Sequence, residues 1–314
     1  MGAAAAGLAG CATNGGAAVA GLAGCATNGG ATGGCGCAAT PGRILLGACL
    51  GPDKVPAMKR LGYDFWEWGA AQAFAPDKDG EWWKRKKDML LAQPLPLRSC
   101  NGFIPGRFRL TGPAADHGPA LRYAETVMRR AEEIGVKTIV FGSGGARNVP
   151  GDVTAKEKKD RPDTERGRDQ YRDFCAELCR RVADLKTTTV VVEPLRPNET
   201  NIVNYVWQGV QICEEVKSPR LAQLADIFHM MAGREPACSL RLAGKWLRHC
   251  HVASYGTRLF PGSDPSTVDR LRPYFDALKE TGYAGGVSCE GGWGKKEDFE
   301  KNLETAIKTL KGLV

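Results

Sequence analysis

The sequence predicts a (β/α)8 TIM barrel over residues 43–314, preceded by a low-complexity tract over residues 1–42. Two observations lead to this fold class. Short apolar runs alternate with longer segments whose apolar residues recur at spacings of three and four, as expected of strands followed by amphipathic helices. The alternating part spans about 270 residues, which is near the usual size of such a barrel.

The first 42 residues differ in composition from the rest of the chain. They contain no Asp, Glu, Lys or Arg, and the segment Gly7–Ala17 is repeated at Gly21–Ala31. A Gly/Ala-rich tract buries too little apolar surface to fold, so we expect it to be disordered. Its Leu-Ala-Gly-Cys element resembles the cleavage box of bacterial lipoproteins, although no basic segment precedes Cys11. Export as a lipoprotein is therefore the alternative to a cytoplasmic location.

Charge and cysteine content limit the classes of partner and compartment. The 43 basic and 35 acidic residues give a net charge of +8, spread over many segments. The densest basic run, Lys84–Lys87, has aromatic and aliphatic neighbours, which predicts a solvated helix face rather than a nucleic-acid site. No apolar stretch reaches the roughly 20 residues that a membrane span needs. The twelve cysteines form no paired CxxC pattern, as expected in a reducing, cytoplasmic compartment.

The predicted elements alternate along the whole barrel portion. Strands are expected at residues 44–49, 63–68, 97–103, 138–141, 188–193, 221–228, 247–253 and 286–290. The main helices between and after them are expected at residues 120–134, 168–185, 202–216, 264–281 and 296–313. Because strands and helices alternate within one domain, this order favours a closed barrel over an open doubly wound sheet.

Polar residues end several of the apolar runs in the second half of the barrel. Glu193 ends the fifth predicted strand, Asp226 lies at the end of the sixth, the seventh carries His251, and Glu290 ends the eighth. The carboxyl ends of the strands meet at one face of a barrel, where reactive residues lie. Three carboxylates and one imidazole form a mostly oxygen ligand set that suits Mn2+, Mg2+ or Co2+. The sequence therefore predicts one divalent-metal site, with Mn2+ as the expected ion.

The local sequences around these residues resemble one family. Residues 193–201 read Glu-Pro-Leu-Arg-Pro-Asn-Glu-Thr-Asn, and residues 141–150 read Phe-Gly-Ser-Gly-Gly-Ala-Arg-Asn-Val-Pro. Together with His229 and the four predicted ligands, these segments resemble the xylose-isomerase-like sugar phosphate isomerase/epimerase superfamily, in particular ketose 3-epimerases of the tagatose/psicose type. The similarity covers essentially all of residues 43–314.

The resemblance implies a role for each candidate residue. The four predicted ligands would hold the metal, and Glu193 and Glu290 would also be the catalytic pair, exchanging a proton on opposite faces of one substrate carbon. Substrate would be bound by Glu199, His229 and Arg258.

One loop departs from the family pattern. Arg258 lies seven residues after His251, where the ketose epimerases have six, and Ser254 stands where relatives often carry an acidic residue. This loop is therefore expected to recognise a different end of the substrate.

Three further features do not have a single interpretation from the sequence. Glu67, near the end of the second predicted strand, is either a substrate contact or a partner in a structural hydrogen bond. His249 lies on the same strand face as His251, although the family's ligand is the second histidine. The segment Gly291–Lys296 follows the eighth strand, where barrels often bind phosphate.

The predicted function is metal-dependent isomerisation or epimerisation of a sugar, in which a proton is removed beside a carbonyl and returned through an enediolate. A lyase acting on inososes or 3-keto sugars would use the same metal site and is the alternative. A DNA-repair endonuclease of the same superfamily would need a histidine-rich multi-zinc cluster, whereas the chain has four histidines. A sugar-binding protein of this fold without activity is expected to have lost some of the metal ligands, whereas all four predicted ligands are present in this chain. The expected partner is a small sugar or keto sugar, with no nucleic acid and no membrane span, and homo-oligomer formation is left open.

Overall fold

The computed structural model describes residues 42–150, 162–262, 264 and 266–314. The predicted low-complexity tract therefore lies outside the described residues, except for Gly42.

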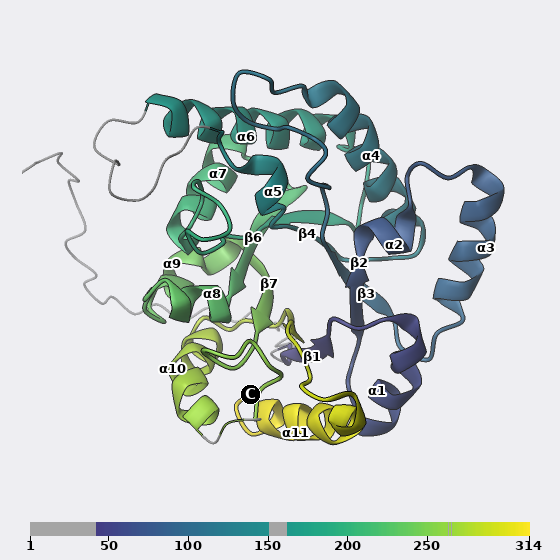
Figure 1. Cartoon of the computed structure of the whole chain (residues 1–314), viewed down its shortest axis with the longest axis vertical. Coiled ribbons are helices and arrows are strands. Elements are labelled where there is room, and N and C mark those ends of the chain that lie inside the picture. Colours follow the sequence, from purple (N-terminus) through teal and green to yellow (C-terminus); the bar gives the residue numbers. More distant parts are fainter. Residues whose placement is uncertain (1–41, 151–161, 263, 265) are drawn as a thin grey trace, which may run out of the picture. The chain divides into compact units, whose positions relative to one another are not determined.

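Eight parallel strands form one sheet around a common centre, with the helices outside them (Figure 1). The order of neighbours is β1-β8-β7-β6-β5-β4-β3-β2, so the first and last strands pair with each other. Between β1 and β2 the barrel is closed by a Cys49–Glu67 bridge, and Leu50 N–H donates to the Glu67 carbonyl at 3.0 Å. The predicted TIM barrel is confirmed. The strands are β1 (Leu45–Ala48), β2 (Trp66–Gly69), β3 (Leu97–Asn101), β4 (Thr138–Phe141), β5 (Thr189–Val192), β6 (Leu221–Asp226), β7 (Leu247–Val252) and β8 (Gly286–Cys289).

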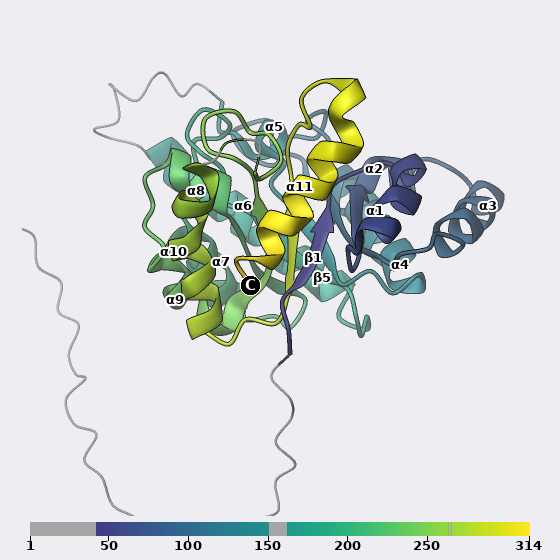
Figure 2. The ribbon, with the colours of Figure 1, turned by 90° about the horizontal axis from the view of Figure 1, so that it is seen from below.

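The helices make the outer layer of the barrel. The last helix, α11, lies between α10 and α1 and completes the ring (Figures 1 and 2). Within the described residues, no helix combines the length and apolar character needed to cross a bilayer. The α-helices are α1 (Val55–Leu61), α2 (Ala70–Phe74), α3 (Gly80–Leu91), α4 (His117–Glu133), α5 (Gly144–Arg147), α6 (Pro162–Arg181), α7 (Val206–Val216), α8 (Ile227–Ala232), α9 (Ser239–Ala243), α10 (Ser266–Glu280) and α11 (Phe299–Lys311).

Several predicted elements begin or end at other residues than the observed ones, and two of these lie beside the candidate site. The sixth strand was predicted to run to Phe228 but ends at Asp226, whose carboxylate accepts hydrogen bonds from the N–H groups of Phe228 and His229. This side-chain cap starts α8 instead. The helix predicted from residue 202 begins at Val206, since Val203 adopts a left-handed backbone with φ of 55°.

The interior of the barrel is filled by a small apolar cluster below the candidate site. Val140, Val191, Ala222 and Leu224 form this cluster, separate from the larger core that contains the buried faces of the helices. Side chains two residues apart on a strand point to the same face. Glu193 follows Val191 by two residues, and Asp226 follows Leu224 by two. The same alternation that fills the barrel therefore directs these two carboxylates toward its axis.

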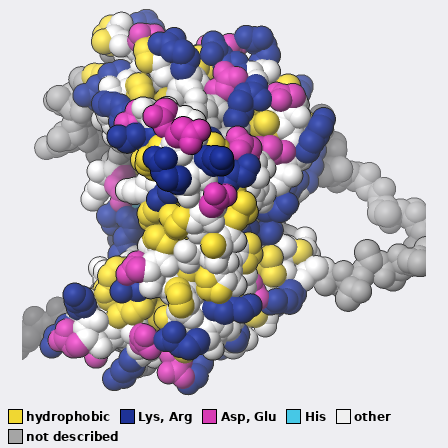
Figure 3. All heavy atoms as spheres, turned by 90° about the vertical axis from the view of Figure 1, so that its right-hand side faces the viewer, with side chains coloured by type: hydrophobic (Ala, Val, Ile, Leu, Met, Phe, Trp, Pro, Cys, Tyr) yellow, Lys and Arg dark blue, Asp and Glu magenta, His cyan; other side chains and the backbone are white. Residues whose placement is uncertain are grey.

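The basic run Lys84–Lys87 lies on α3, where it forms the solvated helix face that the sequence predicts. The underside of α3 buries Trp83 and Leu90, while Lys86 lies over the ring of Trp68 at 4.4 Å. Lys87 pairs with Glu133 at 2.9 Å. Figure 3 faces the side of the molecule that carries α1 and α3, and there basic side chains are interspersed with acidic ones around a hydrophobic centre.

Candidate metal centre and substrate pocket

The four predicted metal ligands meet at the carboxyl ends of consecutive strands. Glu193 follows β5, Asp226 ends β6, His251 lies in β7 and Glu290 follows β8. Each contributes one potential ligand atom, and these four atoms all lie within 4.8 Å of one another. Three of the side chains are buried and that of Glu290 is nearly so. The structure thus brings together the whole predicted ligand set.

The imidazole of His251 is oriented from both sides. Its Nδ1 lies 3.1 Å from Glu193 Oε1 and 3.5 Å from Glu290 Oε2, so this nitrogen faces the cluster. Its Nε2 lies 2.9 Å from Glu67 Oε1, and the other oxygen of Glu67 lies 2.8 Å from His249 Nε2. A carboxylate that fixes the outer nitrogen of a ligand histidine is a regular feature of metal sites, because it sets the ring's tautomer and orientation.

The hydrogen bonds of Glu67 agree with its interpretation as a structural partner. The side chains of Glu67 and His249 are buried and hydrogen-bonded to each other and, through Glu67, to His251. Burial raises the pKa of Glu67, but the charges of His251 and His249 outweigh it and hold that pKa well below its usual range. Glu67 is therefore a structural partner of His251. Cys49 also lies near His251, but burial raises the pKa of its thiol well above the usual value, which disfavours the ligating thiolate.

Asp226 provides a direct test of whether a cation fits this cluster. Its Oδ1 accepts the capping hydrogen bond from Phe228 N–H at 2.7 Å, whereas its Oδ2 is buried and has no hydrogen-bond partner among the described residues. Burial, followed by the charge of Glu290, raises the pKa of Asp226 to about 6. An unpaired buried carboxylate oxygen is costly unless a proton or a cation compensates it. The oxygen-rich ligand set and this free oxygen both fit a divalent ion.

The two candidate catalytic glutamates have contrasting environments. Glu290 accepts from Asn101 Nδ2 at 2.8 Å and from Arg258 Nη2 at 2.9 Å. Burial raises its pKa, but the charge and hydrogen bond of His251, with Arg258, lower it to about 2. No arginine of the described residues bonds the carboxylate of Glu193, and burial, together with the charge of Glu290, raises its pKa.

The three predicted substrate residues lie beside the metal cluster. Arg258 connects Glu290 to Glu199, whose Oε1 lies 3.3 Å from Arg258 Nη1. His229 lies on α8 with Nε2 3.5 Å from Asp226 Oδ2 and 3.8 Å from Glu199 Oε2. Neither ring nitrogen of His229 forms a hydrogen bond within the described residues, although the side chain is buried. These three residues therefore form one polar wall next to the cluster.

Backbone strain is concentrated in the loops of this face. Ser143, Val203, Arg234 and Arg258 all have positive φ, between 44° and 55°, and each follows one of the strands β4 to β7. Non-glycine residues in this region cost energy and cluster at functional sites. The strain at Arg258 accompanies the contacts of its guanidinium with Glu199 and Glu290.

Sequence reasoning missed three residues that support the cluster. Arg147 is fully buried and donates to the backbone carbonyls of Glu193 at 2.8 Å and Phe141 at 3.2 Å, so it joins the ends of β4 and β5. Asn101 donates a hydrogen bond to the carboxylate of Glu290. Arg196 donates to Glu199 at 2.9 Å. Arg147 and Arg196 lie inside the two family-like segments, and their position there was the available signal.

Two loop features make packing or hydrogen-bond contacts within the protein. Ser254 is buried, and its hydroxyl donates to the Phe260 carbonyl at 3.1 Å, so it shapes the loop rather than binding substrate. In the segment Gly291–Lys296, Trp293 packs against the rings of Phe260 and Phe299. The prediction of phosphate binding at this segment stays untested.

A glycine next to the cluster leads to a first testable prediction. Gly142, which follows β4, lies so close to Glu193 that a Cβ at this position would overlap with Glu193 Oε2. We expect Gly142→Ala to displace this carboxylate and weaken Mn2+ binding by at least about tenfold. Isothermal titration of Mn2+ measures the effect. In the control, Gly106→Ala, the added methyl meets only ordinary contacts at 3.8 Å. Equal affinities in the two variants would contradict the close approach.

Removing the support of His251 gives a second prediction. Glu67→Gln keeps the shape of the side chain but loses its charge, so we expect Mn2+ affinity to fall by about 10–100-fold. The matched control is Glu235→Gln, because Glu235 is also buried but caps α7 through Val206 N–H at 3.0 Å. A titration that shows the same affinity for wild type and Glu67→Gln would remove Glu67 from the metal centre.

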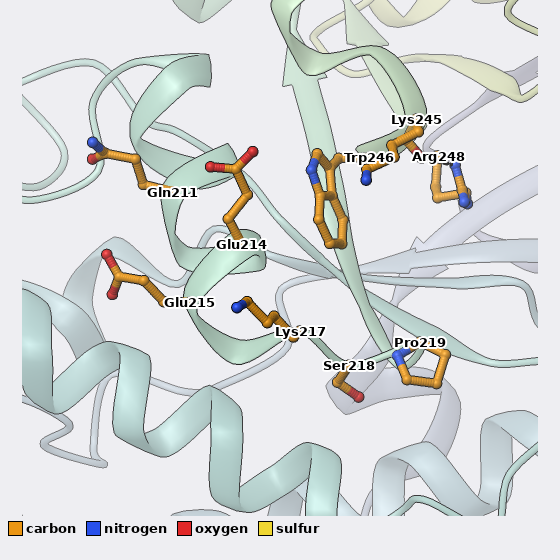
Figure 4. A pocket seen from close by; sticks show the side chains of 9 residues that line it. All are labelled: Gln211, Glu214, Glu215, Lys217, Ser218, Pro219, Lys245, Trp246 and Arg248. Atoms are coloured by element: carbon orange, nitrogen blue, oxygen red, sulfur yellow. Dashed lines mark hydrogen bonds between the residues drawn. The ribbon is translucent and has the colours of Figure 1, made fainter. Parts of the chain in front are cut away.

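Two cavities border different ends of the barrel. One, of about 500 Å³, is lined by Arg196, Phe228 and Tyr255 and lies on the carboxyl face beside the substrate residues. The other, of about 940 Å³, lies near the amino-terminal ends of β6 and β7, where Trp246 stands between glutamates on α7 and two cationic side chains (Figure 4). Only the first adjoins the candidate metal centre.

The fold and the cluster together define a (β/α)8 barrel with a candidate divalent-metal centre at its carboxyl face. The chain belongs to the xylose isomerase-like TIM barrel family, whose model matches residues 55–313. No curated protein sequence matches it.

Solved structures with the same fold include sugar epimerases. The 3-keto-D-glucoside 4-epimerase from E. coli is 19% identical, with a TM-score of 0.67 over 85% of this chain and 100% of its own. D-Psicose 3-epimerase from Clostridium cellulolyticum H10, solved with D-tagatose, is 15% identical, with a TM-score of 0.70 over 86% and 99% of the two chains. The IOLI protein, solved with a zinc atom, is 18% identical, with a TM-score of 0.62 over 86% and 98%.

Proposed function

We propose that this protein is a metal-dependent sugar isomerase or epimerase that acts by proton transfer beside a carbonyl. The observation that carries the proposal is the buried cluster of three carboxylates and His251, in which Asp226 keeps one oxygen free of hydrogen bonds. The epimerases of the same fold support it. Mn2+ is the proposed ion, with Mg2+ or Co2+ as alternatives.

Each residue of the cluster has a part in this mechanism. A bound divalent cation would supply a Lewis acid that polarises the substrate carbonyl. Asp226 and His251 would hold the ion, while Glu193 and Glu290 would both hold it and exchange protons with the substrate. One glutamate removes the proton from the carbon beside the carbonyl, giving an enediolate. The other delivers a proton from the opposite face, which inverts that carbon.

The polar wall beside the cluster would hold the rest of the sugar. Arg258 and His229 can donate to hydroxyl oxygens, and Glu199 can accept from a hydroxyl group. Phe228 lies under the guanidinium groups of Arg196 and Arg258, at 5.2 and 5.0 Å, so its aromatic ring packs against both arginines. Such contacts supply orientation remote from the reacting carbon.

Arg258 therefore gives a third prediction. We expect Arg258→Ala to lower kcat/KM for the true substrate by at least about 100-fold while its Mn2+ content changes little. Arg60→Ala is the control, because Arg60 is an exposed arginine of α1 that pairs with Glu300 at 3.1 Å. If metal content falls in step with activity, Arg258 supports the metal centre through Glu290 and does not select substrate.

The substrate class is tested by a direct screen. Ketohexoses, ketopentoses, 3-keto glycosides and inososes are each incubated with protein and Mn2+, and products are identified by NMR. An epimer or an aldose–ketose pair supports the proposal. Dehydrated or deoxy products would instead identify a lyase that uses the same cluster.

A further inference from the structure

A cavity of about 600 Å³ lies at the amino-terminal side of the barrel, at the opposite ends of the strands from the candidate metal centre. It is bordered by the starts of β3 and β7 and by the segment that leads into β8. Its volume falls within the range of small-molecule sites, roughly 300–1,000 Å³. Three of its lining side chains are cationic, Arg98, Lys245 and Arg248, and no acidic side chain lines it.

The three cations lack acidic partners. Within the described part of the chain, none of them forms an ion pair: Arg248 donates to the carbonyls of Lys245 and Leu247, and Lys245 lies 5.3 Å from the ring of Trp246. Arg98 is about half buried, and burial lowers the pKa of its guanidinium. Positive charges that converge on a cavity without carboxylates favour an anionic ligand.

The adjoining cavity extends this surface toward an aromatic ring. Lys245 and Arg248 line both cavities, and Trp246 lies between them and the acidic residues of α7 (Figure 4). Of those acidic residues, Glu215 is paired with Arg168 at 2.5 Å, whereas Glu214 forms no ion pair within the described residues. A ligand that extends from the cations to the indole therefore has one free carboxylate, that of Glu214, on the other side of the ring (Figure 4).

We propose that Arg98, Lys245 and Arg248 form a binding site for the phosphate group of a small molecule. Arginine guanidinium groups bind phosphate oxygens through paired hydrogen bonds, and lysine adds a positive charge on a flexible side chain. The cavity is larger than a phosphate ion needs, and Trp246 offers a flat surface to a ring carried by a phosphate ester. This site is independent of the proposed activity, because none of its residues belongs to the metal centre or the substrate wall.

Isothermal titration with inorganic phosphate and with adenosine monophosphate tests the site at constant ionic strength. We expect wild type to bind at least one of them, and Arg98→Gln and Arg248→Gln each to weaken binding by at least about tenfold. Arg241→Gln is the control, since it removes the same charge from an exposed arginine of α9 that pairs with Glu280. Lys245→Gln, at an exposed position, provides a further variant if Arg98→Gln does not fold.

The two probes also separate the sources of the phosphate. Tighter binding of adenosine monophosphate, reduced to the affinity of phosphate by Trp246→Ala, indicates a phosphate ester, whereas equal affinities indicate the free ion. Absence of binding by wild type at millimolar concentrations of both probes would overturn the proposal. Equal weakening by Arg241→Gln would also overturn it, because the attraction would then come from net charge alone.

Discussion

Asp226→Asn is expected to lower the affinity for Mn2+ by more than about 100-fold while the barrel stays folded. The substitution replaces the buried Oδ2, which has no hydrogen-bond partner among the described residues, with a neutral amide group. Asparagine also caps helices well, so the hydrogen bond from Phe228 N–H that starts α8 is retained. Metal content after dialysis and circular dichroism measure the two parts of this expectation.

Wild type provides the reference for that experiment. It should take up about one Mn2+ per chain, and Mn2+ at about 100 times its Kd should stabilise the fold by about 2.7 kcal/mol. His251→Ala should lose uptake as Asp226→Asn does. Asp79→Asn is the matched control, because Asp79 caps α3 in the same way through Trp82 N–H at 2.8 Å, far along the chain from the cluster. Wild-type metal content in both cluster variants would disprove the ligand assignment.

Glu193→Gln and Glu290→Gln are each expected to lower kcat by about 10²–10⁴-fold at saturating Mn2+. Glutamine keeps the size and an oxygen ligand, but it cannot accept the proton that must leave the substrate carbon. Substrate binding should remain measurable by calorimetry, because the residues of the polar wall are intact. The effect therefore belongs to the chemical step rather than to binding.

The same two variants distinguish the glutamates from supporting residues. Asn101→Ala removes the hydrogen bond to Glu290 at 2.8 Å but leaves the carboxylate, so its loss of kcat should be smaller than that of Glu290→Gln. Glu235→Gln should behave as wild type. A wild-type turnover rate in either cluster variant would exclude that glutamate from the catalytic pair.

The fold was predictable because local pattern and barrel geometry agree. The eight strands were found from apolar runs, and all eight overlap the observed strands. The error closest to the candidate site was at Asp226, where Ile227 and Phe228 continue the apolar pattern of β6. The hydrogen bonds of the Asp226 carboxylate end the strand there, and a side-chain cap outweighs the apolar pattern.

The positions of the candidate ligands were also predictable, since parallel strands in a barrel present their carboxyl ends at one face. The supporting contacts were not. Glu67 and His251 are 184 residues apart in the chain, and their pairing depends on how β2 and β7 face each other across the barrel. The burial of Arg147 could not be predicted from its residue type either, because arginine side chains are ordinarily exposed to solvent.

Turnover in D2O with and without Mn2+ tests whether the protein inverts a sugar carbon by metal-dependent proton transfer. Wild type, once its substrate is identified, should place solvent deuterium at the inverted carbon of the product only when Mn2+ is present, to the extent that the abstracted proton exchanges before its return. Equal turnover after complete removal of divalent metal, or a product that has lost water and carries no inverted carbon, would contradict it.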